Sequence, residues 1–367
     1  MLIKIPIARP IIDKKDISIA TKALRSGWIS SQGPFIKQFE KKFQTFLGGG
    51  YPITASNGTS ALELGIKALG INPGDEIIVP NFTFAASINS IINCGAIPKI
   101  LDVERNTWTI DIKLIKKSIT KKTRAIMLVH IYGQPCKIDE IISFAKSKNI
   151  LIIEDCAEAL GSKYKKKLVG LHGDCSCHSF FANKTITTGE GGMVVFKKKK
   201  YFNKAQIIKN HGMSKLKKYI HEHVGSNYRL TNIQAAIGIS QLNKIKKLIN
   251  SRKKIFKFYD NNLENELFEK LPSNSWSENS YWYYAIILKK KINREKLINK
   301  LFKKGIEIRT TFYPLNLMKP FKNYSKMSYK NSEYLGLNGI CLPSSGLKIS
   351  EQKYIVKTLN KELKYLL

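Results

Sequence analysis

The chain has 367 residues, 43% of them hydrophobic, and a formal net charge of +35 at pH 7. This length suits one large and one small domain, and no apolar run approaches the roughly 18 residues that a membrane span needs. The basic residues are spread along the whole chain, whereas nucleic-acid binding favours a concentrated basic patch. The composition therefore argues against a nucleic-acid partner and a membrane anchor, and it predicts a cytoplasmic globular protein whose charge attracts anionic substrates.

Six cysteines are also spread thinly through the chain, which is not the pattern of a disulfide framework. Cys175 and Cys177, directly before His178, form a C-x-C pair with no second pair elsewhere in the sequence. Zinc sites commonly use two such pairs, so buried reduced thiols are favoured and no metal is expected.

Between residues 50 and 196, short apolar runs alternate with helical patterns. Strands are predicted at 76–80, 97–103, 124–130, 150–155, 177–181 and 192–196. In "SALELGIKALG", Leu62, Ile66 and Leu69 share one helix face and Gly70 ends the helix. The alternation predicts an α/β fold with a largely parallel sheet that helices cover on both faces.

The pattern changes after residue 230. Residues 231–259 read as one long helix, and strands at 281–288 and 306–312 and helices after Asn293 and from Ser350 follow. We predict a large α/β domain over 1–245 and a small α+β domain over 246–367.

A candidate phosphate site lies at "ASNGTS". Gly58 and Thr59 precede a helix in which Ser60 and Glu63 have the spacing of a capping box. A helix start with a glycine offers free N–H groups and a partial positive charge, which suit phosphate. Any helix needs a cap, so this motif taken alone favours ordinary capping.

Two carboxylates follow the apolar run "ILII". Asp155 stands at the predicted carboxyl end of a strand, where ligands bind in open α/β sheets, and Glu158 lies one helical turn further if a helix begins there. Asp155 could bind a metal, cap the next helix or pair with a cationic cofactor.

Lys184, in "SFFANKTITTGEGG", stands in a predicted loop of small residues after Ser179. A weakly solvated lysine has a more nucleophilic amine and can form a Schiff base with an aldehyde. Pyridoxal phosphate (PLP) needs such a lysine, an acid beside its ring nitrogen and a phosphate cup. A solvated loop lysine is the alternative for Lys184 alone, but the ordered set with Asp155 and Gly58 favours PLP.

The stretches "ASNGTSALELGIKALG", "IEDCAEALGSKY", "SFFANKTITTGEGGMV" and "NYRLTNIQAAIG" resemble the DegT/StrS family of PLP-dependent sugar aminotransferases. The resemblance covers essentially the whole chain. The stretches "WISSQGP" and "NKTITTGEGGMVV" are similar to the perosamine-synthase branch of this family. That branch aminates C4 of GDP-4-keto-6-deoxymannose. The resemblance implies fold type I, the aspartate aminotransferase architecture, with the active site at a homodimer interface.

The resemblance also implies residue roles. The catalytic residues would be Lys184, which binds the cofactor aldehyde, and Asp155, which pairs with the ring nitrogen. Glu158 would lie by the ring hydroxyl and Phe84 would stack on the ring. The phosphate would be held by Gly58, Thr59 and Ser179 and by Asn227 from a neighbouring subunit. The implied substrate-binding residues are Trp28, Ser30, Arg229, Arg309, Tyr313 and Asn316; core packing is the alternative for Phe84 and Trp28.

The implied reaction moves the amino group of L-glutamate to C4 of a nucleotide-linked 4-keto-6-deoxyhexose, for a surface glycan such as O-antigen. Some relatives with histidine in place of Lys184 are dehydratases, so the lysine indicates transamination. Asn316 stands where the perosamine branch has histidine, and it cannot titrate near neutral pH, which leaves the nucleotide and the sugar open. The alternatives are a UDP- or dTDP-linked 4-keto-6-deoxyglucose, giving viosamine, and a PLP-binding regulator without turnover.

Overall fold

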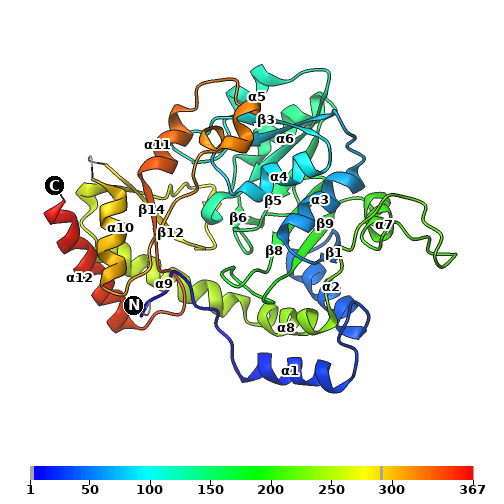
Figure 1. Ribbon diagram of the computed structural model, residues 1–367, viewed down its shortest axis with the longest axis horizontal. Helices are drawn as coiled ribbons and strands as arrows, with labels where there is room; N and C mark the ends of the chain where they lie inside the picture. Colours follow the sequence, from blue (N-terminus) through cyan, green and yellow to red (C-terminus); the bar gives the residue numbers. More distant parts are fainter. Residues whose placement is uncertain (1–3, 290–291, 367) are drawn as a thin grey trace.

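The computed structural model describes residues 4–289 and 292–366 and contains one large, mostly parallel sheet (Figure 1). In space its strands run in the order β1-β9-β8-β5-β4-β2-β3. Their bounds are β1 (Tyr51–Ala55), β2 (Glu76–Pro80), β3 (Ile97–Leu101), β4 (Thr123–Val129), β5 (Leu151–Asp155), β8 (Cys175–Ser179) and β9 (Gly192–Phe196). Only β9 runs against the other six strands of this sheet, and the predicted α/β class is confirmed.

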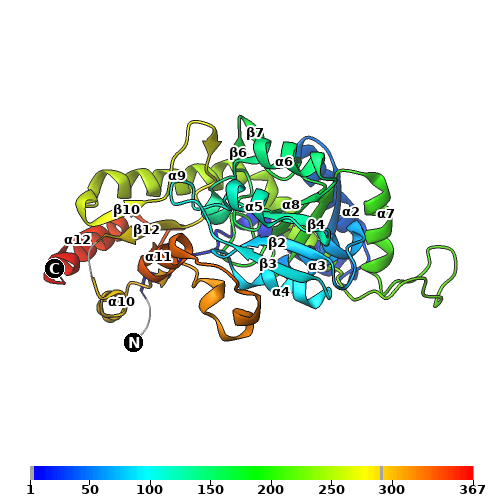
Figure 2. The ribbon, with the colours of Figure 1, turned by 90° about the horizontal axis from the view of Figure 1, so that it is seen from above.

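Helices cover both faces of this sheet because successive strand residues point to opposite sides. Ile77 and Val79 of β2 pack in one cluster with α3 (Gly58–Leu69) and α4 (Ala85–Asn93). Ile78 packs in another with α5 (Ile112–Ser118) and α6 (Ile138–Ser147). Figure 2 shows α3 and α4 on one side of the strands and α6 on the other. A third apolar cluster joins the sheet to α2 (Pro34–Leu47) and α8 (Asn232–Asn243).

The C-terminal part forms a smaller unit, at the left in Figure 1. Its antiparallel sheet has the order β10-β12-β14-β13, with β10 (Phe268–Lys270), β12 (Tyr284–Leu288), β14 (Gly339–Leu342) and β13 (Arg309–Thr310). The helices α9 (Ile245–Asn262), α10 (Arg294–Lys303) and α12 (Ile349–Tyr365) share its apolar core. Ile5 packs in the same core, and its N–H bonds the Gly305 carbonyl at 2.9 Å. The first described residues therefore lie with the small unit.

The prediction of a single helix over 231–259 is wrong. It is broken at Lys244, where φ is −109°, between α8 and α9. The Lys244 side chain is held by an ion pair with Asp13, the N-cap of α1 (Lys14–Arg25), at 2.8 Å. A domain boundary at residue 245 stays a prediction.

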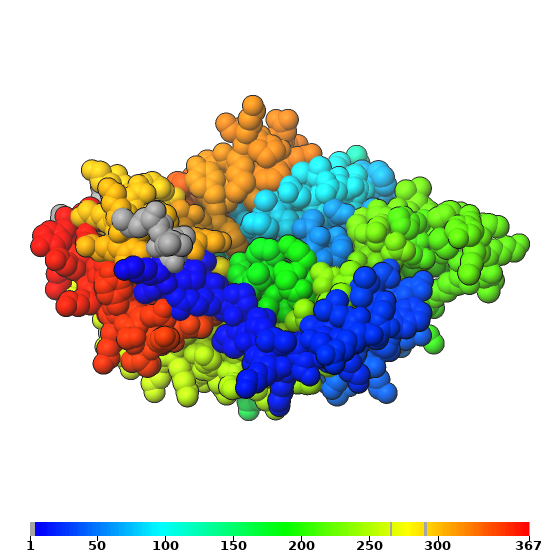
Figure 3. Space-filling view, turned by 60° about the horizontal axis from the view of Figure 1, so that its bottom comes forward, coloured from blue at the N-terminus to red at the C-terminus, as the bar shows by residue number. Residues whose placement is uncertain are grey.

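A segment beyond α7 (Lys199–Ile208) projects from the body of the molecule (Figures 1 and 3). Within the described residues, no helix is both long and apolar enough to cross a membrane.

Candidate active site

A cavity of about 490 Å³ lies where several strands of the large sheet end. Asp155 ends β5 and Ser179 ends β8, while Gly58 and Phe84 follow β1 and β2 within a few residues. Parallel strands bring their carboxyl ends to one edge of a sheet, so these side chains converge. The expected residues that line the cavity are Gly58, Thr59, Phe84, Asp155, Glu158, Ser179, Lys184 and Arg309.

Lys184 stands on a loop that backbone hydrogen bonds hold in place. Its own N–H bonds the Phe181 carbonyl at 2.9 Å, and the Lys184 carbonyl accepts from Arg252 Nη2 at 2.9 Å. Arg252, on α9, is only 5% exposed. This buried guanidinium therefore fixes the backbone from which the Lys184 side chain enters the cavity.

The Lys184 amine lies 3.9 Å from the centre of the Trp282 ring. Burial lowers the pKa of this amine, and the carboxylates of Glu158 and Asp155 partly oppose that shift. The free base of Lys184 is therefore more populated than that of a solvated lysine.

Asp155 is 6% exposed and receives two hydrogen bonds, from Ser87 Oγ at 2.8 Å and from the Ala157 N–H at 3.1 Å. Thr83 lies behind Ser87, with 2.9 Å between the two hydroxyl oxygens. Burial raises the pKa of Asp155, and these hydrogen bonds and Lys184 lower it in part. A buried acid that is costly to ionise alone is suited to a cationic partner in the cavity.

The spacing from Asp155 had allowed Glu158 to stand on a helix, but no helix begins here, and residues 157–158 and 160–161 are in turns. Glu158 Oε2 accepts the Tyr132 N–H at 2.8 Å, which still turns the carboxylate into the cavity. Burial raises the pKa of Glu158 from 4.5 to about 7, against the opposing effect of Lys184.

The pKa of Glu158 predicts how the stability of the ligand-free protein depends on pH. Between about pH 4.5 and 7 the folded protein binds more protons at Glu158 than the unfolded chain does, so stability falls as the pH rises. The change at this one group is on the order of 3 kcal/mol. In Glu158→Gln, thermal unfolding followed from pH 5 to 7.5 should show a flatter decline than in the wild-type protein. An unchanged slope in this variant would contradict the assignment.

The start of α3 also forms part of the cavity wall. Asn57 caps this helix by accepting the Ser60 N–H at 2.8 Å, so the expected capping box of Ser60 with Glu63 is wrong. Glu63 instead accepts the Tyr228 hydroxyl at 2.6 Å. A side chain at Gly58 would place its Cβ 2.9 Å from the Ser179 Cβ, so glycine lets the helix start approach β8.

These residues fit PLP by the chemistry of their side chains. The cavity holds an amine, a buried carboxylate with a raised pKa and a helix N-terminus that suits phosphate. Phe84 is 58% exposed and lies beside Phe312, with 5.6 Å between ring centres, so it is not a core residue.

Several expected residues do not line this cavity. Trp28 is 53% exposed and Tyr313 is 42% exposed, so neither is a core residue. The Ser30 carbonyl accepts the Asn232 N–H at 2.6 Å, which ties this segment to α8. Asn316 Oδ1 accepts from Asn81 at 2.7 Å and its amide donates to Glu333 at 2.7 Å, so its side chain joins the two units instead of entering the cavity.

Asn227 and Arg229 also lie outside the cavity wall. Asn227 Oδ1 accepts from Arg229 Nε at 2.9 Å, and Arg229 Nη1 donates to Asn210 at 2.8 Å. Both residues stand at the base of the projecting segment.

Sequence reasoning missed an aromatic wall. The ring of Tyr132 stacks on that of Trp282, with centres 5.8 Å apart, and on that of Phe312, 5.1 Å apart. Arg252 and Ser87 were also missed: one is hidden in a run of basic residues and the other in a run of small ones. Their roles depend on contacts between distant segments, which no local motif records.

His130, Glu154 and Cys156 form a buried cluster of possible metal ligands, and none of the three lines the cavity. His130 Nδ1 accepts the Cys136 N–H at 3.1 Å, so Nε2 carries the proton and donates to Glu154 at 3.1 Å. Burial raises the pKa of Glu154, but His130 and backbone donors that include Gly173 outweigh it and lower it to about 2. These hydrogen bonds explain the cluster as a structural anchor for the loop after residue 169.

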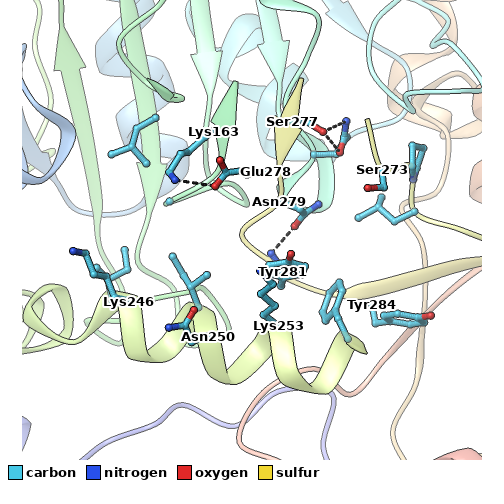
Figure 4. A pocket seen from close by; sticks show the side chains of 18 of the residues that line it. Lys163, Lys246, Asn250, Lys253, Ser273, Ser277, Glu278, Asn279, Tyr281 and Tyr284 are labelled. Carbon is cyan, nitrogen blue, oxygen red and sulfur yellow. Dashed lines mark hydrogen bonds and ion pairs between the residues drawn. The ribbon is translucent and has the colours of Figure 1, made fainter. Parts of the chain in front are cut away.

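A second cavity, of about 880 Å³, lies between α9 and the strands β6 (Lys163–Tyr164) and β11 (Ser277–Glu278) (Figure 4). Its ion pair, Lys163 with Glu278 at 2.8 Å, is largely open to solvent, and Lys246 and Lys253 are exposed. Their amines lack the burial that lowers the pKa of Lys184, so the smaller cavity is the candidate active site.

Comparison with known proteins identifies the family of the chain. The chain is 43% identical over 358 residues to a GDP-perosamine synthase of Escherichia coli O157:H7, and the match covers 97% of this chain and 98% of that protein. It is 39% identical over 343 residues to a GDP-perosamine synthase of Vibrio cholerae, covering 93% and 94%. The PLP form of Spr1654 from Streptococcus pneumoniae superposes with a TM-score of 0.93 at 29% identity, over 99% of each chain. Residues 10–360 match the DegT/DnrJ/EryC1/StrS aminotransferase family, and the chain belongs to this family.

Proposed function

We propose that this chain uses PLP to transfer the amino group of L-glutamate to C4 of a nucleotide-linked 4-keto-6-deoxyhexose, with the GDP-linked sugar as first candidate. The observation that carries the proposal is the desolvated amine of Lys184, which shares one cavity with Asp155, Glu158 and the start of α3. The full-length similarity to GDP-perosamine synthases supports the choice of sugar. We expect the enzyme in the cytoplasm, where both co-substrates are metabolites.

Each residue has a distinct task in this proposal. PLP, when bound, would supply an electron sink for the carbon that loses its proton. Lys184 would hold the cofactor, and because burial lowers the pKa of its amine it would accept and return that proton more readily than a solvated lysine. Asp155, held by Ser87, stabilises positive charge at the ring nitrogen. The aromatic rings of Tyr132 and Trp282 exclude water from this side of the cavity.

The experiment is incubation of the purified protein with L-glutamate and the GDP-, UDP- or dTDP-linked keto-sugar, followed by mass spectrometry and NMR of the products. We expect an amino sugar from one nucleotide, with nitrogen at C4. If glutamate does not bleach the visible absorption of the bound cofactor, the protein is a regulator without turnover. Retained nucleic acid and no yellow colour would exclude the enzyme altogether.

A homodimer is part of the proposal. In the projecting segment, Leu216 is 94%, Tyr219 84% and Val224 93% exposed. Such a group of exposed apolar side chains marks a contact surface. It leads directly to Asn227, which we propose reaches the phosphate site of the partner subunit.

Leu216→Asp combined with Val224→Asp is therefore expected to give a monomer that binds PLP at least about tenfold more weakly. Charged side chains at a buried apolar contact are costly, and the monomer lacks the partner's Asn227. Sedimentation velocity measures the mass and equilibrium dialysis the affinity. Ile349→Asp, at another exposed apolar residue (60%), is the matched control and should stay dimeric. A wild-type protein that is monomeric and fully active would contradict the proposal.

A further inference from the structure

Two polar atoms in the cavity wall have no hydrogen-bond partner among the residues that the structure describes. They are the hydroxyl oxygen of Tyr283 and Oδ1 of Asn183, and both atoms are buried. Tyr283 as a whole is 4% exposed, and both residues line the cavity that holds Lys184. Leaving such a group unpaired costs about 1–3 kcal/mol, and most buried polar groups in proteins are paired. The two atoms therefore indicate where a ligand completes the hydrogen bonding.

Both residues are held in place by their neighbours. The Asn183 carbonyl accepts from Trp282 Nε1 at 3.0 Å and from Arg252 Nη2 at 3.4 Å. The Tyr283 ring stacks on Trp282, with 4.2 Å between ring centres. Burial raises the pKa of Tyr283, while Arg309 and the neighbouring Asn183 amide are among the groups that lower it, although the amide and the phenol are not in hydrogen-bonding geometry. The phenol and the amide are thus close together, on a backbone that is already fixed.

The chemistry of the pair selects the ligand. The Tyr283 hydroxyl both donates and accepts, whereas Asn183 Oδ1 only accepts. The carboxylates of the amino donor only accept, so they cannot pair with Oδ1, and its one donating group is the amino group that reacts with the cofactor. A sugar hydroxyl donates and accepts, and it satisfies the amide in either of its two orientations. Arg309, the nearby cation, is already bound by Glu307 Oε1 at 2.7 Å, which weakens its attraction for a free carboxylate.

We propose that Asn183 and Tyr283 bind hydroxyl groups of the hexose ring and thereby discriminate between hexoses. This inference rests on the proposed function, because it assigns a subsite within the same cavity. The inference distinguishes the two half-reactions, because the pair contacts the acceptor sugar and makes no contact with the amino donor.

The test compares Tyr283→Phe and Asn183→Ala with the wild-type protein, all loaded with PLP. Isothermal titration calorimetry measures the affinity for GDP-mannose, a stable hydroxylated probe, and for GDP, which has the same nucleotide without the sugar. Each variant should lose about tenfold in affinity for GDP-mannose, the effect of one hydrogen bond, and bind GDP within twofold of wild type. The rate at which L-glutamate bleaches the visible absorption should be unchanged. UDP-glucose with UDP, and dTDP-glucose with dTDP, replace the GDP pair if the wild-type enzyme uses those nucleotides.

Tyr281→Phe is the matched control, because Tyr281 lies two residues away and faces the second cavity (Figure 4). It should leave all three measurements unchanged. Equal affinity of wild type and variants for the sugar nucleotide, an equal loss for the bare nucleotide, or slower bleaching by glutamate would overturn the inference. A wild-type protein that binds none of the nucleotide sugars and forms no amino sugar would instead remove the proposed function itself.

Discussion

Replacing Lys184 with arginine is expected to lower the rate of amino transfer by about 10³-fold or more. Arginine keeps the positive charge, but a guanidinium group with a pKa above about 12 neither attacks an aldehyde nor exchanges protons near neutral pH. Steady-state assays measure the rate. Borohydride reduction followed by peptide mass mapping tests the covalent bond, which the wild-type protein should show at Lys184 and the variant should lack.

Lys209→Arg is the matched control for this experiment. Burial also lowers the pKa of Lys209, but its amine is bound to Thr54 Oγ1 at 3.1 Å and lies 3.7 Å from Glu40, outside the cavity wall. The control should keep both its rate and its adduct at Lys184. An adduct on Lys209, or one that survives in Lys184→Arg, would exclude Lys184 as the cofactor lysine.

The part of the site that could be predicted from the sequence consists of residues whose position follows from a neighbouring strand. Asp155 follows four apolar residues and was expected at the carboxyl end of a strand, where it lies. Ser179 was expected near the end of a strand over 177–181, and it ends β8. Lys184 follows within five residues of Ser179, which limits how far it can be from the end of that strand. Local sequence determines such placements because strand direction and loop length leave few alternatives.

The remainder depends on contacts that no local pattern encodes. The strand expected over 306–312 shrinks to β13 because the N–H of Phe312 bonds the Tyr132 hydroxyl at 2.9 Å. That same contact builds the aromatic wall from residues about 180 positions apart. Asn316 was expected near the substrate because of its place in a motif, but its side chain accepts a hydrogen bond from Asn81 instead. Strand β1 was not predicted, since its five residues include Pro52 and follow three glycines.

The acid–base groups of the cavity form one electrostatic unit. Burial alone disfavours charge on Lys184, Asp155 and Glu158, while the opposite charges of the amine and the two acids oppose that effect. This unit has two acids and only one amine, so a cation that binds beside Asp155 adds the positive charge that the acids lack. This reasoning makes Asp155 the second decisive residue.

Asp155→Asn is expected to lower the rate of amino transfer by roughly 100-fold or more, since removing one partner of a buried charge pair costs about 3–5 kcal/mol. The single side-chain oxygen of asparagine can accept the Ala157 N–H, and its amide can then donate to Ser87 Oγ, whose hydroxyl donates to Thr83 instead. The groups stay hydrogen-bonded, so the loss reports the missing charge. The affinity for PLP, measured by equilibrium dialysis, should fall with the rate. Without ligand the variant should be at least as stable as wild type at pH 8, because its buried group no longer has to ionise.

Asp174→Asn is the matched control, because Asp174 accepts the Ile152 N–H at 2.9 Å at the other end of the same strand, β5. It should leave the PLP affinity unchanged, although it alters a carboxylate on the same structural element. If Asp155→Asn bound PLP as tightly as wild type and kept its rate, the ring nitrogen would need no carboxylate. The raised pKa of Asp155 would then reflect burial alone, and its place in the site would be structural.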